Sequence, residues 1–346
     1  MAVNQAQMTP ANLASTISGT AHQERKPQTY WSMAVQSLRR DRVTLVALGF
    51  LAVLLLLSVL ATPITNALVG FGPNETFPEN AFAKPYVWPY LKWRLGMDMV
   101  TAPTILGETG GKIYWLGADQ LGRDQLARLL SGGQVSLTIA FVAAAISMLV
   151  GVSVGALAGY FGGIVDDVIM WFINTMVSIP TIYLLIIVSA IFSPSPITLT
   201  LFLGLFGWFG TARFMRGNVF KVRSLDFTLA ARSVGARNGR IMLQHVIPNS
   251  IPVIIVLTAI DVGALILTES ALSFLGLGIQ PPTASWGSML SRANNFLFLI
   301  DPATGSYNAL HLLVAPGILI TLTVLAFYLI GDGLRDALDP MLKNKR

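Results

Sequence analysis

Long apolar stretches, separated by short polar segments, dominate the chain. Stretches without Asp, Glu, Lys or Arg cover residues 43–61, 135–165 and 168–212, and two further apolar stretches cover 251–275 and 312–330. A helix that spans a membrane needs about 20 mostly apolar residues. The pattern therefore predicts a protein that crosses a bilayer several times.

The stretch 168–212 is too long for a single span. As one helix its 45 residues would reach about 68 Å at about 1.5 Å per residue, which is about twice the thickness of the hydrocarbon layer. The turn-forming sequence SPSP at 193–196 divides it into helices over 168–192 and 196–212. The predicted fold is therefore an all-α polytopic membrane protein with six transmembrane helices.

The composition agrees with the apolar pattern. Apolar side chains make up 53% of the chain and charged ones 12%, and the mean hydropathy is +0.64. Soluble domains contain about 25% charged residues, so a disordered chain, a coiled coil and an ordinary soluble enzyme are excluded. The chain has no cysteine, and its three histidines lie far apart in the sequence. We therefore expect no metal site and no bound cofactor.

The basic residues are divided unevenly among the polar segments. If the N-terminus is cytoplasmic, the cytoplasmic segments hold sixteen of the 23 Lys and Arg. The positive-inside rule then predicts that both termini lie in the cytoplasm. Because topology explains the net charge of +6, we expect no nucleic-acid partner.

These spans divide the chain into five parts. We expect a cytoplasmic N-terminal tail over 1–42, a first transmembrane helix over 43–61, an outer segment over 62–134, a core of five helices over 135–334 and a cytoplasmic tail over 335–346.

The longest cytoplasmic loop, residues 213–248, has a helical pattern of its own. Asp226 is predicted to cap a helix that ends at Val234, Gly235 breaks it, and Asn238 opens a second helix to about His245 that Pro248 stops. Apolar residues recur in both helices beside arginines. The loop is either an ordinary solvated segment or a docking element for a soluble partner that covers those apolar residues.

A second patterned segment follows Trp115. Leucines at i, i+3 and i+4 from Leu126 predict a short amphipathic helix that leads into the second span. Four charged side chains are predicted to pair with one another and fix the angle of this helix: Asp119, Arg123, Asp124 and Arg128.

The fifth span carries two carboxylates, Asp261 and Glu269. Such groups are costly in a membrane and usually face an aqueous cavity or a polar partner. A spacing of eight residues places them about 80° apart around a helix, so they can share one broad face. After this span, Gly276, Gly278, Pro281 and Pro282 end the helix, either as an ordinary terminator or as part of a gate or re-entrant segment.

Three of these segments resemble motifs of one family, the C-type permease subunit of bacterial dipeptide and oligopeptide ABC importers. LAARSVGARNGRIMLQHVIP (229–248) is similar to the family's "EAA" loop, although Leu229 stands where that loop has Glu. LGADQLGRDQLARLLSGGQVSL (116–137) is similar to the family's LGTDxxGRDxxSRxxxGxRxSL, and ESALSFLGLGIQPPTASWG (269–287) is similar to its signature after the fifth span. The resemblance covers residues 30–346.

The resemblance implies a type I ABC importer permease fold in the inner membrane of a bacterium. It implies one half of a pathway for peptides or similar small solutes, with oligosaccharides and nickel chelates left open. The implied partners are a homologous second permease, two cytoplasmic ATPase subunits and an external solute-binding protein. ATP would bind to the ATPase subunits, so this chain is not expected to be an enzyme.

The resemblance also assigns site residues. The coupling loop to the ATPases would use Ala230, Ala231, Gly235, Arg237, Ile241, His245 and Pro248. The outer motifs would use Gly117, Asp119, Gly122, Arg123, Asp124, Gly276, Gly278, Pro281, Pro282, Trp286 and Gly287.

Two questions stay open at this point. A secondary transporter that couples solute to protons through Asp261 or Glu269 is the alternative function, although it does not explain the apolar cytoplasmic loop, and no second half repeats the first. In the outer segment, Trp88, Trp93 and Trp115 either contact a binding protein or the mouth of the pore, or form an interfacial aromatic belt.

Overall fold

The computed structural model describes residues 38–39, 41–87, 109–296, 298 and 309–338. These residues are mostly helical, with one isolated bridge between Ala118 and Asp124. The helices, in chain order, are α3 (Arg42–Val59), α4 (Ala61–Leu68), the 3₁₀ turn η1 (Pro78–Asn80), α7 (Gln125–Phe161), α8 (Gly163–Val177), α9 (Thr181–Ile191), α10 (Pro196–Val222), α11 (Asp226–Ser233), α12 (Asn238–Ile241), the π-helical segment η2 (Met242–Val246), α13 (Ile247–Phe274), α14 (Trp286–Asn295) and α15 (Leu310–Leu338).

The prediction of an all-α membrane protein is confirmed. Within the described residues five helices are long and apolar enough to cross a membrane: α3, α7, α10, the continuous run Asn238–Phe274 and α15. The helices α8 and α9 meet at 78° and make a sixth span if the bent pair counts as one. The structure therefore holds five straight candidate spans and one broken pair.

The expected single helix over 168–192 is wrong in detail. The helical segment starts at Gly163 and breaks between Val177 and Thr181. Pro180 explains the break, because proline has no backbone N–H and disfavours a helical conformation in the residue before it. The run predicted over 135–165 is likewise divided at Gly162 and Gly163, which have φ of 66° and 52°.

The short helix predicted to lead into the second span is continuous with that span. One helix, α7, runs without interruption from Gln125 to Phe161, and Asp124 caps its first turn. The pair Gly132 and Gly133 does not break it, because the space beside these glycines is filled by residues near Trp286. The predicted boundary at residue 135 therefore falls inside α7.

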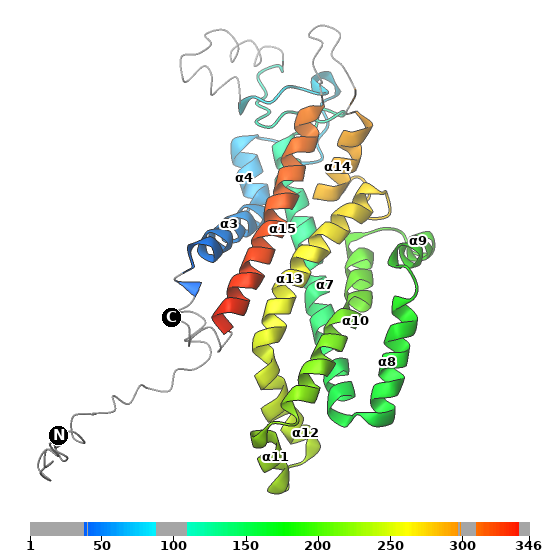
Figure 1. Ribbon diagram of the computed structural model, residues 1–346. Coiled ribbons are helices and arrows are strands. Elements are labelled where there is room, and N and C mark those ends of the chain that lie inside the picture. The colour runs from blue at the N-terminus through cyan, green and yellow to red at the C-terminus, as the bar shows by residue number, and fades with distance from the viewer. Residues whose placement is uncertain (1–37, 40, 88–108, 297, 299–308, 339–346) are drawn as a thin grey trace, which may run out of the picture.

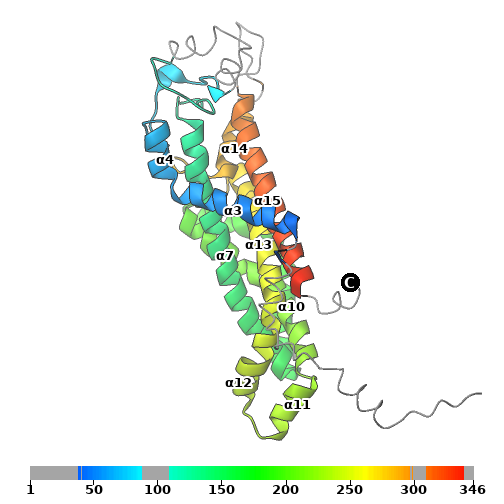
Figure 2. The same cartoon turned by 90° about the vertical axis from the view of Figure 1, so that its left-hand side faces the viewer.

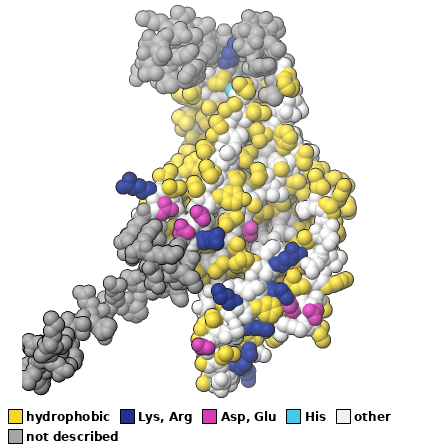
Figure 3. Space-filling view, viewed as in Figure 1, with side chains coloured by type: hydrophobic (Ala, Val, Ile, Leu, Met, Phe, Trp, Pro, Cys, Tyr) yellow, Lys and Arg dark blue, Asp and Glu magenta, His cyan; other side chains and the backbone are white. Residues whose placement is uncertain are grey.

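The long helices α7, α10, α13 and α15 run lengthwise through the molecule (Figure 1). The hairpin of α11 and α12 lies at one end, while α14 and the segment around η1 lie at the opposite end. Viewed from the side, α3 crosses this bundle obliquely before α4 turns along it (Figure 2). Lys and Arg side chains gather toward the hairpin end of the surface in Figure 3, as the positive-inside rule expects of a cytoplasmic end.

The closest helix contact joins α7 to α10. Gly151, Gly155 and Gly159 recur at every fourth position, so they share one face of α7. A Cβ added to Gly155 would lie 2.4 Å from the carbonyl oxygen of Ala212, and one on Gly159 would lie 2.6 Å from that of Arg216. The backbones of the two helices therefore approach to a distance that only glycine permits.

We expect Gly155→Ala to lower the stability of the protein by about 1–3 kcal/mol, because overfilling a packed contact forces the backbones apart. The thermal midpoint of the detergent-solubilised protein measures this. Gly49→Ala on α3 is the matched control, since an added Cβ there meets nothing within 4 Å. Equal midpoints for the two variants would contradict the role of the glycine face.

Candidate functional site

The α11–α12 hairpin bends at Gly235. This residue has a φ of 81°, and the N–H groups of Gly235 and Ala236 donate to the carbonyls of Arg232 and Ala231 at 3.0 and 3.1 Å. Such a left-handed residue after a helix ends it, and glycine adopts it without a steric penalty. The predicted break between two short helices is therefore confirmed.

One side of the hairpin is anchored to the bundle. Ile241 and Val246 are fully buried with Met215 and Val219 of α10. The hydroxyl of Tyr160 at the end of α7 donates to the side-chain oxygen of Asn238 at 3.0 Å. The hairpin is thus a packed extension of the bundle.

The other side of the hairpin is exposed and apolar. Val234 is 84% exposed and Leu243 64% exposed, and Phe227 and Leu229 are about half as exposed as Val234. Of the predicted coupling residues, Ala230, Gly235, Arg237 and Pro248 are exposed, and Ala231 and His245 are partly exposed, whereas Ile241 is buried. Ile241 therefore holds the hairpin in place, and the others are on or near its surface.

Two details of the predicted hairpin are wrong. Asp226 is the first residue of α11, and Leu225 occupies the cap position. Pro248 does not end the second helix, because α12, η2 and α13 form one continuous run over Asn238–Phe274. Pro248 lies in the first turn of α13, directly after the π-helical segment Met242–Val246, where the lack of a proline N–H is tolerated. The Asn249 side chain donates to the carbonyl of His245 at 2.6 Å. The second helix of the hairpin and the fifth span therefore form one continuous helical run.

At the same end a cluster that sequence analysis missed holds α8 to α10. Asp166 makes a two-pronged ion pair with Arg216, in which Nη2 lies 2.5 Å from Oδ2. Arg223 donates to the carbonyls of Gly159 and Tyr160 at 3.0 and 3.1 Å and so satisfies the end of α7. The signal for this cluster was a lone acidic pair at 166–167 inside an apolar region.

At the opposite end, the segment 116–124 forms a tight loop. A Cβ added to Gly122 would lie 1.8 Å from the carbonyl oxygen of Phe77. Gly117 has a φ of 87°, and a Cβ added to it would lie 2.6 Å from the His311 ring. Asp119 accepts from the N–H groups of Leu121 and Arg123 at 2.9 and 3.1 Å. The two glycines are therefore required by close approach of other segments.

The predicted charge pairing in this loop is confirmed for Asp119 and wrong for Asp124. Asp119 lies 2.5 Å from Arg123 and 3.7 Å from Arg128. Arg128 also donates to the carbonyl of Pro73 and the side chain of Asn74 at 3.1 Å each. Asp124 instead accepts from the N–H of Ala127 at 2.7 Å and caps α7. Burial raises the pKa of Asp124 to about 7.

Glu269 lies in a fully buried cage of serines. Ser136 of α7 and Ser273 of α13 donate to its carboxylate at 2.9 and 2.8 Å. The Ser136 hydroxyl in turn accepts from the N–H of Trp286, whose indole donates to the carbonyl of Leu129 at 3.0 Å. One carboxylate therefore joins the outer ends of α7, α13 and α14.

The remaining residues of the 269–287 motif close this cage. Gly276, with φ of 80°, lies just past the end of α13, and the N–H of Ile279 returns to Ser273 at 3.0 Å. Added Cβ atoms on Gly278 and Gly287 would lie 2.3 Å from the Ser273 hydroxyl and 2.4 Å from the carbonyl oxygen of Ser270. Pro281 and Pro282, joined by a cis bond, lie between α13 and α14. This geometry is that of a packed helix terminator.

Asp261 has different surroundings. It is only partly buried near the middle of α13, and the hydroxyl of Thr211 on α10 donates to it at 3.4 Å. Glu269 contacts α7 while Asp261 contacts α10, so the two carboxylates do not form one site. The sequence correctly singles out both residues but does not separate their environments.

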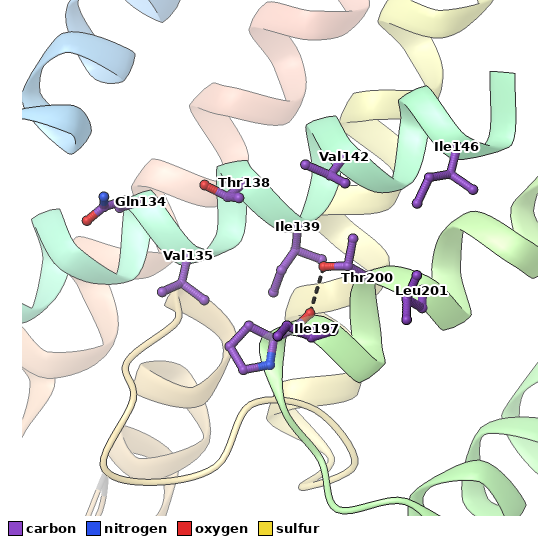
Figure 4. A pocket seen from close by; sticks show the side chains of 10 residues that line it. Gln134, Val135, Thr138, Ile139, Val142, Ile146, Ile197, Thr200 and Leu201 are labelled. Carbon is purple, nitrogen blue, oxygen red and sulfur yellow. Dashed lines mark hydrogen bonds between the residues drawn. The ribbon is translucent and has the colours of Figure 1, made fainter. Parts of the chain in front are cut away.

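A groove lies between the outer halves of α7 and α10 (Figure 4). Its volume is about 460 Å³, and its lining is almost entirely apolar. Gln134 and Thr138 on α7 and Thr200 on α10 supply the polar groups, and the Thr200 hydroxyl donates to the carbonyl of Pro196 at 2.6 Å. Sequence analysis missed this groove, because apolar residues on two separate spans carry no motif.

Comparisons with known proteins agree with this geometry. Residues 151–344 match the family described as the binding-protein-dependent transport system inner membrane component, and residues 29–90 match the N-terminal transmembrane domain of oligopeptide transport permease C. The glutathione transport system permease protein GsiD of Pectobacterium atrosepticum is 38% identical over 239 residues, 69% of this chain and 76% of that protein.

Two further relatives cover similar or larger shares. The dipeptide transport system permease protein DppC of Alkalihalophilus pseudofirmus is 32% identical over 314 residues, 91% of each chain. The oligopeptide transport system permease protein OppC of Haemophilus influenzae is 36% identical over 256 residues, 74% of this chain and 77% of that protein.

The described residues form a helical membrane bundle with a hairpin that is anchored on one side and apolar on the other, and this architecture agrees with that of a transport permease. The chain belongs to the family of binding-protein-dependent inner membrane permeases, and within it to the C-type subunits of the dipeptide and oligopeptide importers. It is therefore a multi-pass inner membrane subunit of an ATP-binding-cassette importer, in which separate subunits hydrolyse ATP. The family gives no support to the proton-coupled carrier.

We expect Ser136→Ala to destabilise the protein by about 1–3 kcal/mol, because the buried Glu269 carboxylate loses a donor and the Trp286 N–H loses its acceptor. Thermal unfolding in detergent measures this. Ser153→Ala is the control on the same helix, since that exposed hydroxyl only donates to the carbonyl of Leu149. The idea fails if the two variants unfold together.

Asp124 predicts a pH dependence of stability. Its pKa of about 7 lies above the unfolded value of about 3.9, so the folded state binds the proton more tightly. This contribution is fully present below about pH 4 and is lost as the pH rises through about 7. Asp124→Asn keeps a neutral capping oxygen, so its unfolding midpoint should rise relative to wild type as the pH increases from about 4 to about 7. A difference that is constant with pH would exclude this linkage.

Proposed function

We propose that this chain forms one half of the pathway through which an importer carries peptides or similar small solutes into the cell. The support is that its relatives are permeases named for glutathione, dipeptides and oligopeptides. Glutathione is itself a small peptide, so a short peptide is the chemistry these cargoes share. Oligosaccharides and nickel chelates are less favoured on this ground.

The proposed partners are a homologous second permease, two cytoplasmic ATPase subunits and an external solute-binding protein. The observation that carries this proposal is the α11–α12 hairpin, which is anchored on one side and apolar and exposed on the other. Exposed apolar residues outside the membrane need a covering surface. A cleft on each ATPase would receive one such hairpin.

The geometry also supports a mechanism. When the ATPase subunits close on ATP, the docked hairpin moves with them. Because the hairpin is continuous with α13, its displacement reaches the pathway. The pathway then alternates between outward-open and inward-open states, and ATP biases the two-state equilibrium only as far as the hairpin prefers one ATPase geometry.

Purification and reconstitution test the proposal. The chain is tagged in its native host, solubilised gently and isolated with its partners, which mass spectrometry identifies. The complex is then placed in liposomes, and ATP-dependent uptake of a labelled dipeptide is measured with and without the binding protein. Recovery of a second permease and of ATPase subunits, with uptake that needs both ATP and the binding protein, is the expected result. Isolation of this chain alone from an intact preparation would overturn it.

We expect Gly235→Val to reduce uptake strongly while ATP hydrolysis continues, because a β-branched residue resists a φ of 81° and alters the bend of the hairpin. The readout is peptide transported per ATP hydrolysed. Gly239→Ala is the matched control, since an added Cβ there also meets nothing within 4 Å but needs no left-handed conformation. Normal coupling in Gly235→Val at normal protein level would refute the role of the bend.

A further inference from the structure

Asp261 carries a carboxylate near the middle of a membrane helix, and this carboxylate is not fully enclosed by the described residues. It lies near the middle of α13, and it is partly accessible. A carboxylate at this depth requires an aqueous cavity or a polar partner. Glu269, the other intramembrane carboxylate of α13, has polar partners because it is fully buried among serine donors. Asp261 has no such cage.

The described residues leave most of the acceptor capacity of Asp261 unused. Its hydrogen bond from Thr211 is long, at 3.4 Å, and it makes no ion pair among the described side chains. The nearest arginines along α10 are engaged elsewhere. Arg213 donates to Asn174 on α8 at 2.9 Å, and Arg216 pairs with Asp166. An ionised carboxylate can accept about four hydrogen bonds, so Asp261 can accept further donors, and its charge favours a cationic one.

Thr211 is itself buried, whereas Asp261 and its neighbours along α13 are partly exposed. Gly210, next to Thr211 in the chain, has nothing within 4 Å of an added Cβ. Ala264 and Thr268 follow Asp261 along α13 at helical spacing and are also partly exposed. A small polar group can therefore approach Asp261 along the partly exposed side of α13.

We propose that Asp261 and Thr211 form a subsite that binds the terminal ammonium group of the peptide cargo as it passes through the permease. The inference rests on the proposed function. An ammonium carries three donors and one positive charge, and it pairs with a carboxylate through charge-assisted hydrogen bonds. A hard metal ion fits less well, because it takes six or more oxygen ligands and the described residues hold no cluster of acidic or histidine side chains suited to a metal.

The test uses the complete reconstituted importer with saturating loaded binding protein. Uptake of a labelled dipeptide and hydrolysis of ATP are measured in parallel for Asp261→Glu, Asp261→Asn and Asp261→Lys. We expect uptake to decrease in that order, with Asp261→Asn about tenfold below wild type, as for the loss of one charge-assisted hydrogen bond. ATP hydrolysis stimulated by the binding protein should stay within about twofold of wild type, since docking is untouched. Asp167→Asn on α8, an exposed carboxylate, is the control and should transport normally.

Three outcomes would overturn the subsite. Wild-type uptake in Asp261→Asn would show that the charge does not contact cargo. Parallel loss of uptake and ATP hydrolysis would make Asp261 a coupling residue. A lower yield of assembled complex, or a lower thermal midpoint, in Asp261→Asn would make it one partner of an ion pair between subunits. Failure of the wild-type importer to take up peptide would instead refute the proposed function.

Discussion

The close contact between α7 and α10 sets the geometry of both ends of the molecule. Three glycines on α7 let the two backbones meet, and in a membrane such packing replaces the hydrophobic drive that holds soluble helices together. At one end this contact places the α8 ion pair and the hairpin anchor beside the same two helices. At the other end it leaves the groove lined by Gln134, Thr138 and Thr200. A displacement between α7 and α10 would therefore alter all of these sites together.

The two carboxylates of α13 lie in different surroundings, and the proposed transport role falls on Asp261 alone. Glu269 accepts hydrogen bonds from Ser136 on α7 and Ser273 on α13, and Ser136 in turn accepts from the Trp286 N–H of α14, so its carboxylate is enclosed by the fold. Asp261 receives one long hydrogen bond and is partly exposed. Ionisable groups inside a membrane either have hydrogen-bonding partners within the protein or serve a function such as binding a solute. The first description fits Glu269 and the second fits Asp261.

The sequence predicts the fold class and the bend of the hairpin well, because both depend on local sequence. Apolar length identifies the spans, and Gly235 identifies the hairpin bend through a conformation that glycine adopts freely. The broken pair α8–α9 and the merging of the hairpin with α13 were missed, because they depend on how the chain accommodates Pro180 and Pro248 rather than on their presence. The Asp166–Arg216 pair and the groove join residues far apart in the sequence, and one sequence holds no record of such contacts. Most of the predicted tails (1–37, 40 and 339–346) and residues 88–108, with Trp88 and Trp93, lie outside the described residues, and α15 extends into the predicted C-terminal tail as far as Leu338.

The continuity of the run Asn238–Phe274 has a mechanical consequence. The run contains a π-helical segment at Met242–Val246 and a proline at 252 but is not broken, so a twist applied at α12 is expected to turn α13 in the same sense. The distance from Asn238 to Asp261 is about 35 Å at about 1.5 Å per residue, and a side-chain tip lies about 5–6 Å from the axis. A twist of about 20° would then sweep the Asp261 carboxylate through about 2 Å, which is enough to break a hydrogen bond. A rotation of the hairpin would in this way be transmitted through α13 to a side chain in the middle of the membrane.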